Sequence, residues 1–194
     1  MKTLVFYGSP LENSHTRALL DAMLEELDGE IKFVDCYRAD IAPCKDCKYC
    51  FHKSGCSIKD GMQEIYEYIK VCDAVIIATP MHFGTVSGPM LNVFTRLQSF
   101  WSSRHIRKEE DKDKIKPKYG ALAVTTGGNW VNMELLMEGT VDFAFDHMEA
   151  EQIGSVYAKE TDTHPVKDNA KALEKARYLA RRLNELCSAA SEQA

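Results

Sequence analysis

The chain of 194 residues is 45% hydrophobic and 27% charged, a composition typical of a globular domain and not of a disordered or collagen-like chain. Its 24 Lys and Arg against 29 Asp and Glu give a net charge of -5, which disfavours a nucleic acid as partner. The N-terminus lacks the pattern of a signal peptide, and no run of eighteen apolar residues occurs. We therefore expect a soluble, cytoplasmic protein without a membrane partner.

Apolar runs alternate with amphipathic segments along the chain. Short apolar runs are typical of strands buried on both faces of a parallel sheet, and apolar positions at three- and four-residue steps are typical of helices. In chain order we predict strand 3–7, helix 14–27, strand 31–34, helix 60–70, strand 74–78, helix 89–101, strand 119–125, helix 131–148, strand 153–157 and helix 166–187. This alternation predicts a single α/β domain over residues 1–194, a doubly wound parallel sheet with helices on both faces.

Two segments interrupt this alternation. The first is a Cys-rich loop over residues 43–57. The second, residues 104–118, carries seven Lys or Arg and four Asp or Glu. We expect this second segment to be a solvated charged excursion; the alternatives are a flap over a ligand and a basic patch for a nucleotide phosphate.

The loop after the first predicted strand, residues 8–16, is rich in hydroxyl groups and leads directly into a helix. The hydroxyls of Ser9, Ser14 and Thr16, with backbone N–H groups at the helix start, are suited to bind a phosphate dianion. The alternative is that Ser14 only caps the helix. The loop matches neither an ATPase phosphate-binding loop nor a dinucleotide-binding fingerprint.

Two further loops should leave the same edge of the sheet, which is where open parallel sheets bind ligands. Residues 79–89 carry the aromatic rings of His82 and Phe83 at a position where loops are usually polar. Residues 125–130 combine two glycines, which allow close backbone approach, with the stacking surface of Trp130. These features predict a flat, apolar ligand.

Four of the seven cysteines, Cys44, Cys47, Cys50 and Cys56, fall within thirteen residues. Four thiolates in a compact loop can ligate a [4Fe-4S] cluster, and the first three have the C-x2-C-x2-C spacing of bacterial ferredoxins. Tetrahedral zinc is one alternative; thiols without a stable metal, or disulfides formed after purification, are another. The isolated cysteines should be small core residues. They are Cys36, Cys72 and Cys187.

These motifs resemble those of the flavodoxin-like NAD(P)H-dependent FMN reductase family, and the cysteine cluster resembles that of its iron-sulfur flavoprotein branch. The resemblance covers nearly the whole chain. It implies that the first loop binds the FMN phosphate through Ser9, Pro10, Ser14, His15 and Thr16. It implies flavin contacts from the other two loops through Pro80, Met81, His82, Phe83, Gly84, Thr125, Thr126, Gly127 and Gly128. The helix after the second loop is similar to the family motif at Gly88, Phe94 and Arg96 and departs from it at Asn92 and Thr95.

The resemblance also implies a flavodoxin-like five-stranded parallel sheet in the order 2-1-3-4-5. The expected activity is an FMN-dependent oxidoreductase that passes electrons from NAD(P)H or a ferredoxin-like donor to a small-molecule or protein acceptor, with a [4Fe-4S] cluster on the four clustered cysteines. Because FMN carries the redox chemistry, we predict no catalytic side chain. His82 is expected to donate to the flavin ring, to orient the substrate or simply to pack. Related proteins imply a homodimer or homotetramer.

Three other functions fit parts of the same pattern. The first is an NAD(P)H-dependent reductase of FMN, quinones or nitro compounds that has no cluster. The second is a flavodoxin-type electron carrier without a substrate of its own. The third is a zinc-stabilised interaction protein, which would contain zinc and no flavin.

Overall fold

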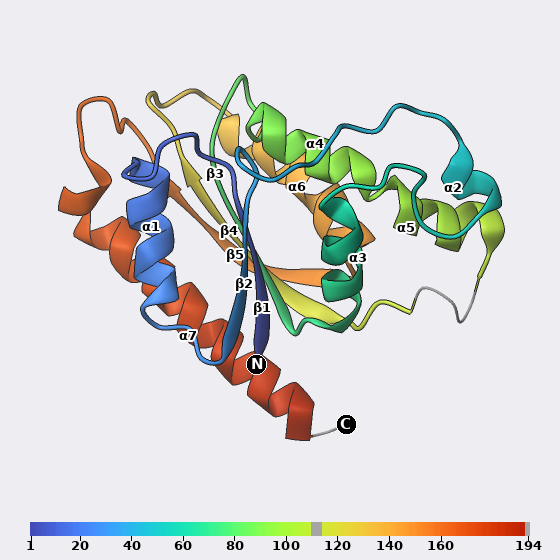
Figure 1. Ribbon diagram of the computed structural model, residues 1–194. Helices are drawn as coiled ribbons and strands as arrows, with labels where there is room; N and C mark the ends of the chain where they lie inside the picture. Colours follow the sequence, from blue (N-terminus) through green and yellow to red (C-terminus); the bar gives the residue numbers. More distant parts are fainter. Residues whose placement is uncertain (110–113, 193–194) are drawn as a thin grey trace.

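Five parallel strands form one twisted sheet in the computed structural model, which describes residues 1–109 and 114–192 (Figure 1). The strands are β1 (Lys2–Tyr7), β2 (Glu30–Asp35), β3 (Ala74–Pro80), β4 (Lys118–Thr125) and β5 (Ala150–Ala158). They pair in the order β2-β1-β3-β4-β5, and every pair is parallel. The predicted strand order and the flavodoxin-like fold class are confirmed.

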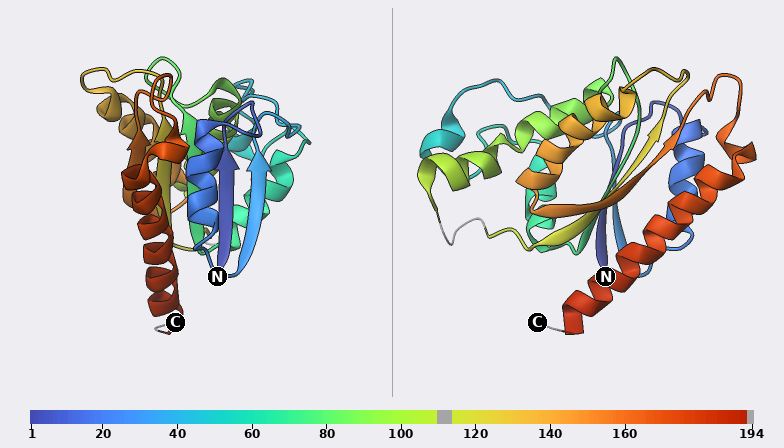
Figure 2. Two further views of the ribbon diagram at one scale, coloured as in Figure 1. Left: turned by 90° about the vertical axis from the view of Figure 1, so that its left-hand side faces the viewer. Right: turned by 180° about the vertical axis from the view of Figure 1, so that it is seen from behind.

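Helices cover both faces of this sheet (Figure 2). One layer contains α1 (His15–Leu24) and α7 (Ala170–Glu192), and the other contains α3 (Met62–Val71), α4 (Gly88–Arg96), α5 (Gln98–Ser102) and α6 (Met133–His147). Successive strand residues point to opposite faces, so Val5 packs in the first layer and Phe6 in the second. Among residues 1–109 and 114–192, no helix has the length and apolarity needed to cross a membrane.

The main difference from the predicted elements is a break in the helix expected over 89–101. It divides into α4 and α5, which a π-helical turn, η1 (Ser103–Arg107), extends. The Tyr66 hydroxyl donates to the backbone carbonyl of Arg96 at 2.8 Å, so this carbonyl is engaged by a side chain. The N–H of Phe100 instead donates to the carbonyl of Leu97 at 2.9 Å, which tightens the chain there. A tertiary contact that no local pattern reveals therefore interrupts the helix.

The predicted charged excursion over 104–118 is only partly irregular. It starts inside η1, and Lys118 at its end is buried as the first residue of β4. Residues 110–113 of this excursion, like residues 193–194, lie outside the described residues. One short element, α2 (Tyr49–His52) in the Cys-rich loop, escaped the periodicity, because four residues show no repeat. The helix predicted over 166–187 begins instead with a 3₁₀ turn, η2 (Val166–Asp168), and α7 starts at Ala170.

The glycine at position 120 of β4 is a steric requirement of this packing. A Cβ atom there would lie 2.5 Å from Cε1 of Phe145, whose ring is buried under α6. We expect Gly120→Ala to lower the free energy of unfolding by about 1–3 kcal/mol, because the buried ring cannot move away without disturbing the core. Urea unfolding measures this change.

Gly139→Ala is the matched control, because Gly139 lies in α6 with open space around it. Alanine is the better helix former, so this variant should gain about 0.5–1 kcal/mol. Equal unfolding midpoints for Gly120→Ala and the parent protein would contradict the predicted clash.

Candidate functional site

The three loops predicted to bind a ligand meet at the carboxyl edge of the sheet. The hydroxyls of Thr16, at the start of α1, and Thr125, at the end of β4, are 2.6 Å apart. The backbone N–H of Met81, after β3, donates to the carbonyl of Thr125 at 2.8 Å. Thr125 thus joins the loops that follow β1, β3 and β4, as the parallel sheet predicts.

The loop after β1 presents hydrogen-bond donors at the start of α1. The Ser14 side chain accepts from the backbone N–H of Arg17 at 3.0 Å, so Ser14 is the N-cap of this helix. The Tyr7 hydroxyl, 2.8 Å from the Ser14 hydroxyl, also holds the loop by donating to the carbonyl of Leu11 at 2.6 Å. Capping and phosphate binding are compatible here, because the first backbone N–H groups of a helix point outward without intrahelical partners.

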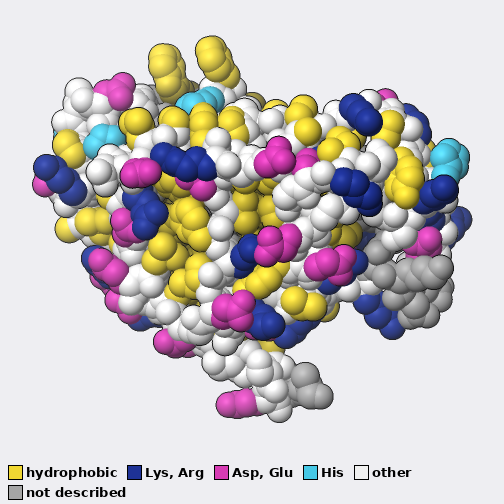
Figure 3. Space-filling view, in the orientation of Figure 1, with side chains coloured by type: hydrophobic (Ala, Val, Ile, Leu, Met, Phe, Trp, Pro, Cys, Tyr) yellow, Lys and Arg dark blue, Asp and Glu magenta, His cyan; other side chains and the backbone are white. Residues whose placement is uncertain are grey.

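An apolar pocket of about 380 Å³ lies between the loops that follow β3 and β4. It is lined by Met81, His82, Phe83, Gly84, Thr126, Trp130, Val131, Met133 and Leu136. Phe83 is fully exposed and Trp130 is 72% exposed, so both rings stand at the rim of the pocket. Figure 3 shows hydrophobic side chains projecting from this upper edge of the molecule. Such a rim is suited to cover a flat apolar ligand.

The turn that carries Phe83 is tight. The backbones of His82 and Thr85 exchange hydrogen bonds of 2.8 and 3.0 Å. Phe83 and Gly84 between them have φ angles of +51° and +79°. A bulky residue rarely adopts the left-handed region, so the backbone holds the Phe83 ring outward at a cost in stability.

A fourth loop, residues 159–166 after β5, completes the edge and was missed by the sequence analysis. The backbone N–H of Thr161 donates to the carbonyl of Thr126 at 3.0 Å, and the N–H of Val166 donates to Nδ1 of His15 at 3.3 Å. The cluster of Thr, Asp and Pro after the fifth predicted strand was the available signal. This loop is therefore bonded both to Thr126, which lines the pocket, and to His15 at the start of α1.

The four clustered cysteines lie apart from this pocket, on the segment that carries α2 beside α5 (Figure 1). Cys44 and Cys47 are exposed, Cys50 and Cys56 are partly buried, and all four are free thiols. Within the described ranges, no group of three or more His, Cys, Asp or Glu side chains is arranged to hold a metal ion. The donor set is chemically suited to a metal, and its role stays a prediction.

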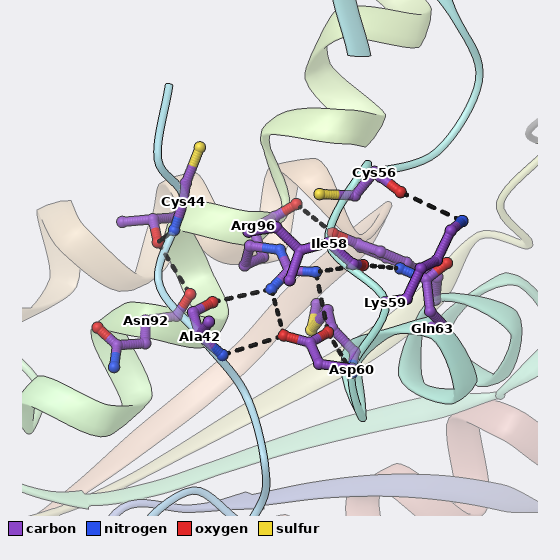
Figure 4. Close-up of polar contacts among 12 residues, drawn as sticks. Ala42, Cys44, Cys56, Ile58, Lys59, Asp60, Gln63, Asn92 and Arg96 are labelled. Carbon is purple, nitrogen blue, oxygen red and sulfur yellow. Dashed lines mark hydrogen bonds and ion pairs between the residues drawn. The ribbon is translucent and has the colours of Figure 1, made fainter. Parts of the chain in front are cut away.

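A buried ion pair closes the base of this segment (Figure 4). Arg96, the last residue of α4, has no exposed side-chain surface and pairs with Asp60 at 2.6 Å. Its guanidinium also donates to the carbonyls of Ala42 at 2.8 Å and Ile58 at 3.4 Å. The Arg96 side chain lowers the pKa of the Asp60 carboxyl against the opposing effect of burial, so the pair is ionised.

The turn that carries Cys50 docks on α5 and η1. The Ser102 hydroxyl donates to the Cys50 sulfur at 3.3 Å, and the Arg107 guanidinium donates to the Cys50 carbonyl. The ring of Phe51 lies against Trp101, with centroids 6.2 Å apart. Trp101 is therefore part of this contact.

Burial separates the seven thiols into two classes. The isolated cysteines are buried, as predicted, and desolvation raises the pKa of Cys36 to about 12 and of Cys72 and Cys187 to about 11. These three thiols are therefore protonated and unreactive at neutral pH. Of the clustered cysteines, Cys47 has a pKa lowered by a hydrogen bond from the Ser57 hydroxyl. The accessible thiols all belong to the clustered set.

Comparison with known proteins gives a family for this chain. The family model described as NADPH-dependent FMN reductase matches residues 1–173. An iron-sulfur flavoprotein from Archaeoglobus fulgidus is 32% identical over 139 residues, which are 70% of this chain and 67% of that protein. One from Methanosarcina thermophila is 30% identical over 132 residues, 66% of this chain and 64% of that protein. The chain thus matches about two thirds of the length of these two relatives.

Solved structures share the fold. An NAD(P)H:quinone oxidoreductase from Methanothermobacter marburgensis superposes with a TM-score of 0.75 at 14% identity, covering 94% of this chain and 96% of that one. An FMN-dependent NADH-azoreductase from Bacillus anthracis, solved with FMN, superposes with a TM-score of 0.64 at 14% identity. The match covers 94% of this chain and 99% of that one. At these identities the likeness concerns the fold alone.

The outward Phe83 ring gives a prediction about stability. Asn tolerates the left-handed region better than Phe, and the exposed ring contributes little packing. We expect Phe83→Asn to raise the free energy of unfolding by about 0.5–1 kcal/mol, measured by urea unfolding without ligand. In contrast, Phe100→Ala should lower it by about 3–5 kcal/mol, because Phe100 is buried. A marked loss of stability in Phe83→Asn would show that the ring packs in the folded protein.

Proposed function

The chain belongs to the NADPH-dependent FMN reductase family of flavin-dependent oxidoreductases, and we propose that it binds FMN at the carboxyl edge of its sheet and passes electrons from a reduced donor to an acceptor. One observation carries this proposal: Thr125 and Thr126 join a set of donors at the start of α1 to an apolar pocket beside it. A phosphate at one end and a flat ring at the other match the two chemistries that FMN presents.

The start of α1 is the proposed phosphate end. Ser9, Ser14 and Thr16 supply hydroxyls, and the first backbone N–H groups of α1 point the same way. When Thr125 donates to Thr16, the proton of the Thr16 hydroxyl is free to bond a phosphate oxygen. Pro10 and His15 complete the residues that we assign to this end.

The pocket is the proposed ring end. When bound, FMN supplies the redox chemistry, since it exchanges either a hydride or single electrons. Phe83 and Trp130 would cover the ring and exclude water, and Met81 would pack against it. Backbone N–H groups of Gly84 or of the Gly127–Gly128 turn would donate to the ring edge that becomes negative on reduction. Pro80 and His82 lie on the same turn, where His82 would donate to the ring or orient the substrate.

We also propose that Cys44, Cys47, Cys50 and Cys56 ligate a [4Fe-4S] cluster. Four free thiols within thirteen residues supply the ligands, and both relatives compared above are named iron-sulfur flavoproteins. Zinc on the same thiols is the competing occupant.

The donor is proposed to be NAD(P)H, since the description of the family names NADPH, with a ferredoxin-like protein as second candidate. Charge favours this second candidate, because residues 43–59 carry four Lys and one Asp in a chain of net charge -5. Figure 3 shows Lys and Arg side chains gathered over this side of the molecule. An acidic carrier would be steered to it. The apolar rim of the pocket supports the further expectation of a homodimer or homotetramer.

The FMN site is tested by matched Thr→Val variants. Thr16→Val keeps the side-chain volume and removes one hydrogen bond to a charged group, so it should weaken FMN binding about ten-fold or more. Thr3→Val is the control: Thr3 is equally buried at the opposite end of β1, and its hydroxyl has no hydrogen-bond partner among the described residues. Fluorescence titration of the flavin-free protein measures both. Equal weakening by the two variants would contradict the site, and a parent protein without FMN affinity would overturn the proposed function.

The cluster is tested by absorption and metal analysis of anaerobically purified protein. We expect flavin bands over a broad visible shoulder and about four iron per FMN. Cys44→Ser should lose the shoulder and the iron and keep the FMN, because the two sites are separate. Stoichiometric zinc, or a flavin spectrum without metal, would refute the cluster while leaving the reductase intact. Rapid NAD(P)H oxidation with a quinone would distinguish a reductase from a carrier.

A further inference from the structure

One side chain, that of Arg96, binds a backbone carbonyl on each side of the clustered cysteines. Ala42 stands two residues before Cys44, and Ile58 stands two residues after Cys56. The guanidinium of Arg96 donates to both carbonyls, at 2.8 and 3.4 Å. Arg96 therefore holds the backbone next to both the first and the last cysteine of the segment. Figure 4 shows Cys44 and Cys56 on either side of Arg96.

Asp60 makes this anchor rigid. Its two oxygens accept from the two terminal nitrogens of Arg96, at 2.6 and 3.0 Å, in a planar fork. The same carboxylate accepts from the backbone N–H groups of Ala42 at 3.0 Å and Met62 at 3.1 Å. Both sides of the segment are thereby tied to one buried ion pair at the end of α4, whose side chains are 0% and 6% exposed.

The hydrogen bonds of Arg96 and Asp60 all join groups of the protein itself, so this anchor forms without a metal. The other two cysteines are held less directly, Cys47 by the Ser57 hydroxyl at 3.2 Å and Cys50 by Ser102 at 3.3 Å. A loop whose ends are already together loses less conformational entropy when its side chains converge on a common ligand. By holding the two ends of the cysteine segment together, Arg96 and Asp60 therefore favour metal uptake, although neither side chain is a ligand.

We propose that Arg96 is a positioning residue for the cysteine segment: its fork with Asp60 fixes the separation of Cys44 and Cys56 before any metal binds. This inference rests on the proposed function only in taking the cysteines as ligands. Lysine would not replace Arg96, because an ammonium group cannot make the planar bidentate contact and reach two carbonyls as well.

The separation is measurable in the metal-free, full-length protein. In a Cys47→Ser/Cys50→Ser background, nitroxide labels on Cys44 and Cys56 report their distance by pulsed electron paramagnetic resonance, while the three buried cysteines stay unlabelled. With Arg96 present we expect one narrow distance distribution. Arg96→Lys should broaden it severalfold, whereas Arg181→Lys should not; Arg181 also has two carboxylate partners, Glu26 and Glu174, but lies on α7.

Equally narrow distributions in the parent background and in Arg96→Lys, or a broad distribution in both, would overturn the proposal. If Arg96→Lys does not fold, Asp60→Asn keeps the side-chain shape and removes the charge of the fork, and the same outcomes apply. A purely structural role would lower the unfolding midpoint without broadening the label distances.

Iron uptake supplies a second readout. Reconstituted under identical conditions, Arg96→Lys should take up iron at least several times more slowly than the Arg181→Lys control, with unchanged FMN affinity. If the parent protein takes up no iron, the cluster proposal fails, and the label distances still decide the role of Arg96. Equal uptake by Arg96→Lys and Arg181→Lys would count against positioning.

Discussion

All five strands run in the same direction, so their carboxyl ends lie along one edge of the sheet and the loops that follow them converge there. Each connection must cross a face of the sheet as a helix, which separates these loops widely in sequence. Thr16 and Thr125 are 109 positions apart and share a hydrogen bond of 2.6 Å. The proposed flavin site is therefore a consequence of strand order, and no single loop contains it.

Helix α4 connects the two proposed sites. It begins at Gly88, directly after the turn that carries Phe83, and it ends at Arg96, which holds the cysteine segment. Nine helical residues span about 12 Å. A short, well-packed helix thus fixes the distance between the edge of the sheet and the base of the cysteine segment.

Several features that do not stabilise the folded state lie at the proposed flavin site and at the cysteine segment. The left-handed backbone at Phe83 and the exposed ring of Trp130 contribute little to folding, and the guanidinium of Arg96 is removed from water. Hydrophobic burial in the two helical layers offsets such costs. The three buried cysteines belong to these layers, whereas the clustered thiols are on the accessible segment, where ligand binding is sterically open.

The sequence by itself determined the alternation of strands and helices, the parallel sheet and the three loops that meet at its carboxyl edge, because periodicity and turn residues are local properties. It also separated the clustered cysteines from the isolated ones by spacing alone. It did not reveal the break after Arg96, since Tyr66 causes it from another helix. Nor did it reveal the fourth loop at Thr161 or the pairing of Arg96 with Asp60. These contacts join residues far apart in the chain, so only the tertiary structure decided which side chains share a site.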